Sequence, residues 1–341
     1  MHDNVAALER VKFDPRWLID VSSRDAGTTV FGNRLEMPVM LAPTGLTRLS
    51  HPKAELAGCR AAGKAGTVFI VSTTSTYPIE AITRVAGGPV WFQLYLWRDP
   101  DDVAALVDRV GNAGCEALVL TIDVPLAGNR ERDARNGATL PPRLGPRQVF
   151  GAVRHPRWTV DFFRPPRVWY GSLPNGVRPD VGIGDTSATW ERLRWLRGIW
   201  PKTLIVKGVL SVRDALQAVA AGADGVYVSN HGGRQLDGCR PTAEVLPKIA
   251  AAVGDKSVVL VDGGIRRGSD AVKVRALGAS ASLIGRPWVF ALAAGGESAV
   301  VELLQAMKED VDRTLALVGV PRYDDVDHMA LAGDMLADSV S

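Results

Sequence analysis

Gly225-Val226-Tyr227-Val228 runs directly into Ser229-Asn230-His231-Gly232-Gly233-Arg234-Gln235-Leu236-Asp237-Gly238. The first four residues form a short, continuous apolar run, which is typical of a parallel strand buried on both faces. A histidine, two glycines and an arginine therefore follow the carboxyl end of a strand together. In a barrel of alternating strands and helices, that end of the strands carries the catalytic residues. The alternative is an ordinary solvated polar loop.

Seven more apolar runs of the same kind recur along the chain. Together with the first, they predict eight strands at residues 38–42, 68–72, 90–95, 117–123, 204–207, 225–229, 258–262 and 282–285. Segments with helical spacing lie between the strands or after them, at residues 54–64, 100–110, 212–221, 244–253, 269–277 and 300–317. Asp99 and Ser211 are suitable amino-terminal caps for two of these helices.

Eight strand-then-helix units in about 250 residues have the size of a (β/α)8 TIM barrel, and we predict this α/β fold. An open, doubly wound sheet is the main alternative. Such a sheet binds dinucleotides at a glycine-rich turn after a strand, whereas Gly182-Ile183-Gly184 has two of the three glycines and no preceding strand. Residues 131–187 are too long for a strand-to-helix loop and are predicted to pass over the active site after the fourth strand. Residues 300–317 are predicted to form a carboxyl-terminal closing helix.

The composition is that of a globular enzyme with a sizeable core. Of the 341 residues 46% are hydrophobic, and we predict that residues 1–341 form a single domain. The net charge of +3 is too small to indicate nucleic-acid binding. The three cysteines are far apart, which favours free thiols in a reducing cytoplasm over disulfides or a metal site. No apolar stretch reaches the roughly 18 residues that span a bilayer, and the amino terminus lacks the apolar segment of a signal peptide.

Each predicted strand ends in groups that can contact a ligand. These groups belong to Pro43, Thr44 and Gly45, then Ser72, Gln93, Tyr95, Thr121, Asp123, Lys207, Ser229, His231, Asp262, Gly264, Arg266, Gly285 and Arg286. Glycines and arginines after the last two strands suit the phosphate site that barrels often have there. For any single residue a structural role is an equally good explanation, but packing does not explain polar groups at all eight strand ends.

His231 can remove a hydroxyl proton near neutral pH. Arg234 lies three residues later and can bind a carboxylate through two parallel hydrogen bonds. A base beside a carboxylate-binding group indicates a small 2-hydroxy acid as the substrate.

From about Asp3 to about Val320 the chain resembles the FMN-dependent 2-hydroxy-acid dehydrogenases and oxidases. Within that family it is most similar to the bacterial L-lactate dehydrogenases and to mandelate dehydrogenase. The resemblance is carried by Ala42-Pro43-Thr44, Phe92-Gln93-Leu94-Tyr95, Val206-Lys207-Gly208, residues 229–237 and Asp262-Gly263-Gly264-Ile265-Arg266-Arg267-Gly268. It implies a TIM barrel with FMN as the cofactor.

The resemblance also implies roles for individual residues. His231 would be the catalytic base, Asp123 its partner, and Lys207 the cation at the pyrimidine end of the flavin. The implied substrate-binding residues are Arg234, Arg130 and Tyr95. The implied FMN-binding residues are Pro43, Thr44, Gly45, Ser72, Gln93, Thr121, Lys207, Ser229, Asp262, Gly264, Arg266, Gly285 and Arg286.

The implied reaction is the oxidation of an (S)-2-hydroxy acid, foremost L-lactate to pyruvate, with the electrons passed to a quinone or another acceptor. Three alternatives stay open: an oxygen-using 2-hydroxy-acid oxidase or monooxygenase, an (S)-mandelate dehydrogenase, and a flavin-binding homologue with diverted chemistry. The resemblance further implies a homotetramer.

Two regions depart from the family pattern. Relatives carry an additional amino-terminal helical segment before the position of Asp3, with a tyrosine that binds the substrate carboxylate. The present sequence starts at Met1. Three interpretations stay open: the start is misplaced, the chain is shortened, or the protein works without this segment and with a more open pocket. Residues 155–185 mix aromatic and basic side chains, as membrane-surface segments do. Docking of this segment would place the protein on the inner face of the cell membrane, whereas an active-site lid or an oligomer contact fits a cytoplasmic protein.

Overall fold

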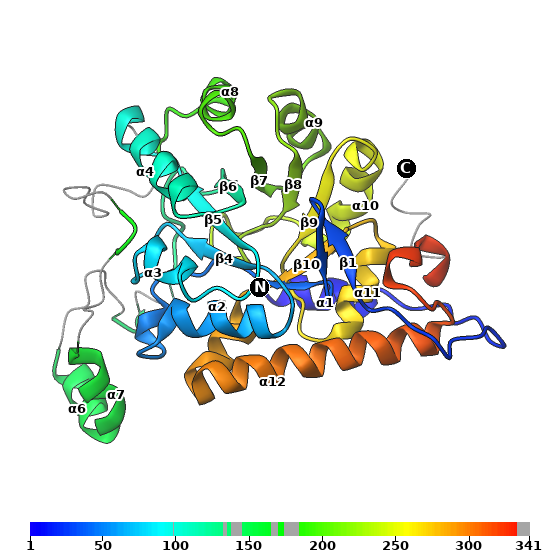
Figure 1. Cartoon of the computed structure of the whole chain (residues 1–341), viewed down its shortest axis with the longest axis horizontal. Coiled ribbons are helices and arrows are strands. Elements are labelled where there is room, and N and C mark those ends of the chain that lie inside the picture. Colours follow the sequence, from blue (N-terminus) through cyan, green and yellow to red (C-terminus); the bar gives the residue numbers. More distant parts are fainter. Residues whose placement is uncertain (98, 132–134, 138–144, 165–169, 174–183, 333–341) are drawn as a thin grey trace.

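The barrel expected from the sequence is present in the structure, a computed structural model that describes residues 1–332 except 98, 132–134, 138–144, 165–169 and 174–183. Its strands close in the order β10-β3-β4-β5-β6-β7-β8-β9 (Figure 1), and every neighbouring pair is parallel. The strands are β3 Val39–Leu41, β4 Phe69–Ser72, β5 Val90–Tyr95, β6 Ala117–Thr121, β7 Thr203–Val209, β8 Gly225–Val228, β9 Val258–Val261 and β10 Ala281–Ile284. All eight lie within a few residues of the predicted ranges.

The strands are apolar on both faces because each one packs inside and outside the barrel. A cluster of buried side chains fills the interior, formed by Met40, Ala42, Val68, Ile70, Trp91, Ala117, Val119, Ile205, Tyr227, Leu260, Ala281 and Leu283. The opposite faces pack against the surrounding helices in a second, larger cluster. The interior is therefore a packed core, and ligands can bind only at its ends.

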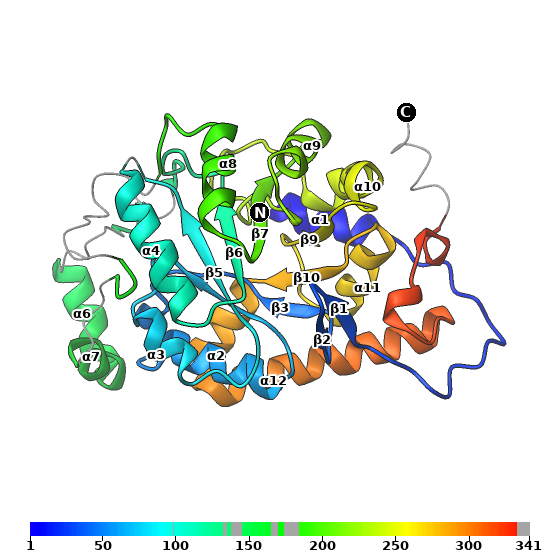
Figure 2. The same cartoon turned by 45° about the horizontal axis from the view of Figure 1, so that its top comes forward.

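Helices surround the barrel (Figure 2). They are α1 His2–Arg10, α2 Ala54–Lys64, α3 Ile79–Thr83, α4 Pro100–Asn112, α6 Pro146–Arg154, α7 Pro156–Phe163, α8 Trp190–Ile199, α9 Val212–Ala220, α10 Thr242–Val253, α11 Gly268–Ala276 and α12 Arg286–Val318. Short 3-10 turns lie at Thr47–Leu49, Tyr323–Asp325 and His328–Ala330. Both predicted caps are present, since the Asp99 carboxylate accepts hydrogen bonds from two backbone N–H groups of α4 and the Ser211 hydroxyl accepts one from α9.

A small hairpin closes the amino-terminal end of the barrel, and nothing in the sequence predicted it. It consists of β1 Thr28–Val30 and β2 Asn33–Leu35, joined at Phe31 and Gly32. Both loop residues have positive φ, as tight hairpin turns require. The Phe31 ring packs edge-on against Trp91, with 5.7 Å between ring centroids. Gly225 leaves room for this ring, because a Cβ there would lie 2.6 Å from it.

The predicted closing helix is the second part of α12. Non-helical backbone at Gly295 and Gly296 divides α12 into two helices, and α12 packs against α2 and α11 (Figure 1). By length and composition alone α12 could cross a membrane, contrary to the expectation that no stretch of this chain could. Alanines, glycines and glutamates interrupt its large apolar side chains, and we assign it to the outer layer of the barrel.

The predicted excursion after the fourth barrel strand contains α6 and α7, which stand away from the barrel in Figure 1. Arg48 ties α7 to the barrel by donating hydrogen bonds to the carbonyl oxygens of Asp161 and Arg164. Trp158 adds a hydrogen bond from Nε1 to the Leu49 carbonyl oxygen at 2.8 Å. Residues 132–134, 138–144, 165–169 and 174–183 of the excursion lie outside the described part of the chain. The single-domain organisation stays a prediction.

Candidate active site

A cavity of about 370 Å³ opens at the carboxyl ends of the strands. Fourteen of the predicted site residues line it: Pro43, Thr44, Gly45, Ser72, Tyr95, Arg130, Lys207, His231, Arg234, Asp262, Gly264, Arg266, Gly285 and Arg286. The other four, Gln93, Thr121, Asp123 and Ser229, are hydrogen-bonded to residues of this lining or to one another. Residues from all eight barrel strands or the loops after them therefore meet in one place.

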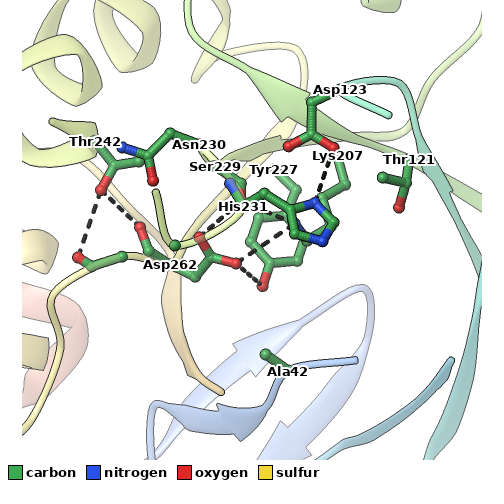
Figure 3. Close-up of polar contacts among 12 residues, drawn as sticks. Ala42, Thr121, Asp123, Lys207, Tyr227, Ser229, Asn230, His231, Thr242 and Asp262 are labelled. Carbon is green, nitrogen blue, oxygen red and sulfur yellow. Dashed lines mark hydrogen bonds and ion pairs between the residues drawn. The ribbon is translucent and has the colours of Figure 1, made fainter. Parts of the chain in front are cut away.

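His231 follows β8, and its ring is held by Asp123, which follows β6. The distance between His231 Nδ1 and Asp123 Oδ1 is 3.0 Å (Figure 3). Burial raises the pKa of Asp123, but the charge of Lys207 and the hydrogen bond from His231 outweigh this effect and leave the pKa below its ordinary value. An ionised carboxylate can only accept, so Nδ1 is the donor, and in the neutral form of the ring Nε2 then has the free lone pair. The pair is therefore prepared for general base chemistry.

The backbone around this pair is shaped for close approach. Gly208 has a φ of +105°, and a Cβ there would lie 2.7 Å from the Cβ of Asp123. Glycine in the Val206-Lys207-Gly208 motif thus makes room for the carboxylate. His231 itself has a φ of +55°, a conformation that is uncommon for residues other than glycine and that often marks functional sites.

Lys207, on β7, belongs to a buried network that spans three strands (Figure 3). Its ammonium group donates to Ser229 Oγ at 2.8 Å, and Ser229 Oγ donates to Asp262 Oδ1 at 2.7 Å. The ammonium nitrogen lies 3.6 Å from Asp262 Oδ2. Lys207 is only 4% exposed, and its charge is therefore little screened by solvent.

A second buried chain links the ends of β4, β5 and β6. Ser72 Oγ lies 3.2 Å from Gln93 Oε1, and Gln93 Nε2 donates to Thr121 Oγ1 at 3.0 Å. The three side chains are at most 6% exposed. Their polar groups are fixed by one another, which gives this wall of the site a rigid hydrogen-bonding surface.

The loops after β9 and β10 bring Arg266 and Arg286 to the cavity. Gly263 and Gly264 both have positive φ, and α12 begins at Arg286. Burial lowers the pKa of Arg286, and the charges of Arg234 and Arg266 lower it further. Guanidinium groups that repel one another beside a helix amino terminus are suited to bind a phosphate. This end of the cavity therefore fits the phosphate of FMN.

Tyr95, Arg130 and Arg234 line the part of the cavity near His231. Burial raises the pKa of the Tyr95 phenol well above its usual range, and Asp123 adds to the effect. The phenol therefore stays protonated and can donate a hydrogen bond. Arg130 contacts the Arg234 carbonyl oxygen at 3.4 Å, so the two guanidinium-bearing segments are joined.

Sequence reasoning assigned no role to several residues that hold the site together. Gln235 Nε2 donates to the carbonyl oxygens of Asp123 and Leu126 at 3.1 and 3.0 Å. Asn230 exchanges two hydrogen bonds of 2.8 Å with the side chain of Asn4 on α1. The sequence could have indicated Gln235 and Asn230, because both lie inside the motif around His231. No motif in the sequence indicates a role for Asn4.

Comparisons with known proteins agree with this geometry. The family described as FMN-dependent dehydrogenase matches residues 1–332. A putative L-lactate dehydrogenase of Mycobacterium tuberculosis is 43% identical over 315 residues, which cover 91% of this chain and 76% of the relative. (S)-Mandelate dehydrogenase of Pseudomonas putida is 43% identical over 326 residues, 93% of this chain and 82% of the relative.

The solved structures give the same result. The crystal structure of a monotopic membrane protein, (S)-mandelate dehydrogenase, has a TM-score of 0.92 and 41% identity, and the match covers 97% of this chain and 90% of that one. The predicted TIM barrel, FMN cofactor and enzyme class are confirmed: the chain belongs to the FMN-dependent dehydrogenase family.

Proposed function

We propose that this protein oxidises an (S)-2-hydroxy acid to the 2-oxo acid, with L-lactate as the substrate. The observation that carries the proposal is the His231–Asp123 pair, joined at 3.0 Å, in one cavity with Arg234, Arg130 and Lys207. Relatives with about 40% identity are named L-lactate dehydrogenase, L-lactate oxidase and (S)-mandelate dehydrogenase.

In this reaction the bound FMN supplies a two-electron acceptor. Arg234 and Arg130 bind the substrate carboxylate and fix the orientation of the hydroxyl-bearing carbon. His231 Nε2 receives the hydroxyl proton of the substrate, and the ionised Asp123 stabilises the imidazolium that results. Tyr95 donates a hydrogen bond toward the substrate carboxylate. Lys207 provides a fixed positive charge for the negative charge that develops next to it.

A second substrate, (S)-mandelate, is supported by the relative named (S)-mandelate dehydrogenase. Gly45 and Thr74 both line the cavity, and the Thr74 side chain occupies the space next to Gly45. The size of the residue at position 74 is therefore expected to decide whether an aryl group fits. Sequence identity does not favour one substrate over the other. It is 43% both for the mandelate dehydrogenase of Pseudomonas putida and for the putative lactate dehydrogenase of Mycobacterium tuberculosis.

The reaction is tested by anaerobic bleaching of the yellow protein with L-lactate, (S)-mandelate or glycolate, with D-lactate as the stereochemical control. We expect L-lactate to bleach the flavin absorbance and D-lactate to leave it unchanged. His231→Gln should keep the colour and lose about 10²–10⁴-fold in bleaching rate, the usual contribution of a general base. Unchanged bleaching by this variant would refute the assignment of the base. Reoxidation by a quinone analogue compared with oxygen then identifies the acceptor, for which we propose a quinone.

We further propose that α6 and α7 rest on a membrane surface at the inner face of the cell membrane. Phe150, Val153 and Phe163 are each at least 63% exposed, and Arg154 stacks on the Phe150 ring at 4.6 Å. Exposed aromatic side chains beside arginines are suited to the interface of an anionic bilayer. The structural relative described as a monotopic membrane protein supports the same interpretation. Part of the predicted docking segment, residues 165–169 and 174–183, lies outside the described residues.

Flotation with anionic liposomes tests this contact. Replacement of Phe150, Val153 and Phe163 by serine should abolish flotation, because the anchoring apolar area is lost. The matched control replaces three exposed apolar residues of other helices, Ile199, Leu216 and Leu317, and should float like wild type. Equal flotation of both triple variants would contradict the proposed membrane contact. The homotetramer stays a prediction that the mass in solution will test.

A further inference from the structure

Tyr227 is a tyrosine in the interior of the barrel, directly below the cavity. It lies in the middle of β8, has no exposed surface and belongs to the interior cluster. In the β7–β8 register it is the partner of Lys207, and in the β8–β9 register it is the partner of Leu260. A buried phenol oxygen is unfavourable unless it is hydrogen-bonded. The sequence alone gave Tyr227 no role beyond strand packing.

The phenol of Tyr227 is bound to the Lys207 network (Figure 3). Its OH donates to Asp262 Oδ2 at 2.9 Å, and burial together with the negative charge of Asp262 raises the tyrosine pKa, so the proton stays in place. The other carboxylate oxygen of Asp262 accepts from Ser229 at 2.7 Å. Two hydroxyl groups from β8 and the residue after it therefore hold the carboxylate.

The ion pair between Lys207 and Asp262 is a long one. The Lys207 ammonium hydrogen-bonds to Ser229 Oγ at 2.8 Å and stays 3.6 Å from Asp262 Oδ2. It also lies 4.9 Å from the centroid of the Tyr227 ring, within the range of a cation–π contact. The attraction between opposite charges grows as their separation falls, so the position of Asp262 decides how much of the Lys207 charge is offset.

We propose that Tyr227 is a positioning residue that tunes the reduction potential of the bound flavin, by holding Asp262 away from Lys207. The inference rests on the proposed function, because it uses the assignment of Lys207 to the pyrimidine end of FMN. Without the phenol, Asp262 Oδ2 loses its donor in a buried site. The carboxylate then turns toward the neighbouring ammonium and offsets more of its charge. The flavin becomes harder to reduce.

Tyr227→Phe removes this one oxygen and keeps the ring under Lys207. The midpoint potential of bound FMN, measured against a reference dye, should fall. We expect the equilibrium constant for reduction to drop about tenfold, which for a two-electron couple is about 30 mV. The rate of flavin reduction by the 2-hydroxy acid should fall with it, while substrate affinity stays unchanged because Arg234 and Arg130 are untouched.

Tyr323→Phe is the matched control. Tyr323 is also fully buried, and its OH donates to the Ala271 carbonyl oxygen at 3.2 Å, away from the cavity lining. This variant should keep the wild-type potential and will report any general effect of losing a buried phenol. A wild-type potential in Tyr227→Phe, or an equal fall in both variants, would overturn the inference.

The proposed function fails separately, if no 2-hydroxy acid bleaches the wild-type protein. In that case, or if Tyr227→Phe does not retain flavin, the crystal structure of the variant decides. A Lys207–Asp262 distance shorter than 3.6 Å supports the inference, and an unchanged distance contradicts it.

Discussion

Replacement of Asp123 by asparagine tests the role of the carboxylate behind His231. The two side chains share a 3.0 Å hydrogen bond and are only 14% and 19% exposed, respectively. An asparagine oxygen can still accept the hydrogen bond from the Nδ1–H group, so the ring keeps its orientation while the negative charge is lost. That charge contributes most once the imidazole has taken up a proton and become positive.

The size of the effect follows from this geometry. A hydrogen bond to a charged group contributes about 1.5–3 kcal/mol and one between neutral groups about 0.5–1.5 kcal/mol. Loss of the charge alone therefore removes about 1–1.5 kcal/mol, and about 1.4 kcal/mol corresponds to a tenfold change in rate. We therefore expect flavin reduction in Asp123→Asn to be about tenfold slower. Lys207 also loses a neighbouring negative charge, which favours flavin reduction, so a slower reaction is due to His231 and not to the flavin potential.

Stopped-flow reduction of the flavin by L-lactate, without oxygen, measures this rate and the substrate affinity separately. Affinity should change little, because Asp123 faces His231 and the assigned carboxylate-binding residues are intact. Asp224→Asn is the control, since Asp224 pairs with Arg197 at the opposite end of the barrel. A wild-type rate in Asp123→Asn, or a loss confined to affinity, would refute the reasoning.

Three further changes test the packing around the site and one buried carboxyl group. A Cβ at Gly45 would lie 1.8 Å from Thr74 Oγ1, so Gly45→Ala should break the Thr74–Ser72 contact and destabilise the protein by about 1 kcal/mol. The loss should be smaller in a Thr74→Ala background, which removes Oγ1 but keeps the Cβ, and a double-mutant cycle of unfolding free energies measures the difference. Gly208→Ala should displace Asp123 and slow flavin reduction, measured as above. Burial raises the pKa of Glu55 above its ordinary 4.5, so its contribution to stability is present below pH 4.5 and is lost as the pH rises through the native pKa. Between pH 4.5 and the native pKa of Glu55, the melting temperature of wild type should therefore fall relative to that of Glu55→Gln.

Much of the barrel was predictable because its strands are buried on both faces. The run at residues 225–228 and its seven counterparts are continuous apolar segments, and such runs mark parallel strands without knowledge of their neighbours. The groups at the cavity were predictable for a related reason. Residues such as Lys207 and Arg286 follow apolar runs directly, and the carboxyl ends of all barrel strands share one face.

Features that depend on contacts between distant segments could not be predicted. The hairpin at residues 28–35 is too short to show a period, and its turn places Phe31 at a positive φ that usually selects glycine or asparagine. Tyr227 has the pattern of a packing residue, since its hydrogen bond exists only after β8 and β9 pair. Asn4 is one polar residue on an amphipathic helix until that helix docks beside Asn230.

Hydrogen bonds between side chains of neighbouring strands hold the site together, so its chemistry depends on the register of the barrel strands. Lys207 and Asp262 are connected through Ser229, and these residues come from the ends of three consecutive strands. Val228 pairs with Val261 in the β8–β9 register, which brings the next residues, Ser229 and Asp262, side by side. A slip of one residue would turn every side chain of a strand to the other face. The polar network therefore forms only when β7, β8 and β9 pair in this register, and the position of the Lys207 charge in the cavity depends on that pairing.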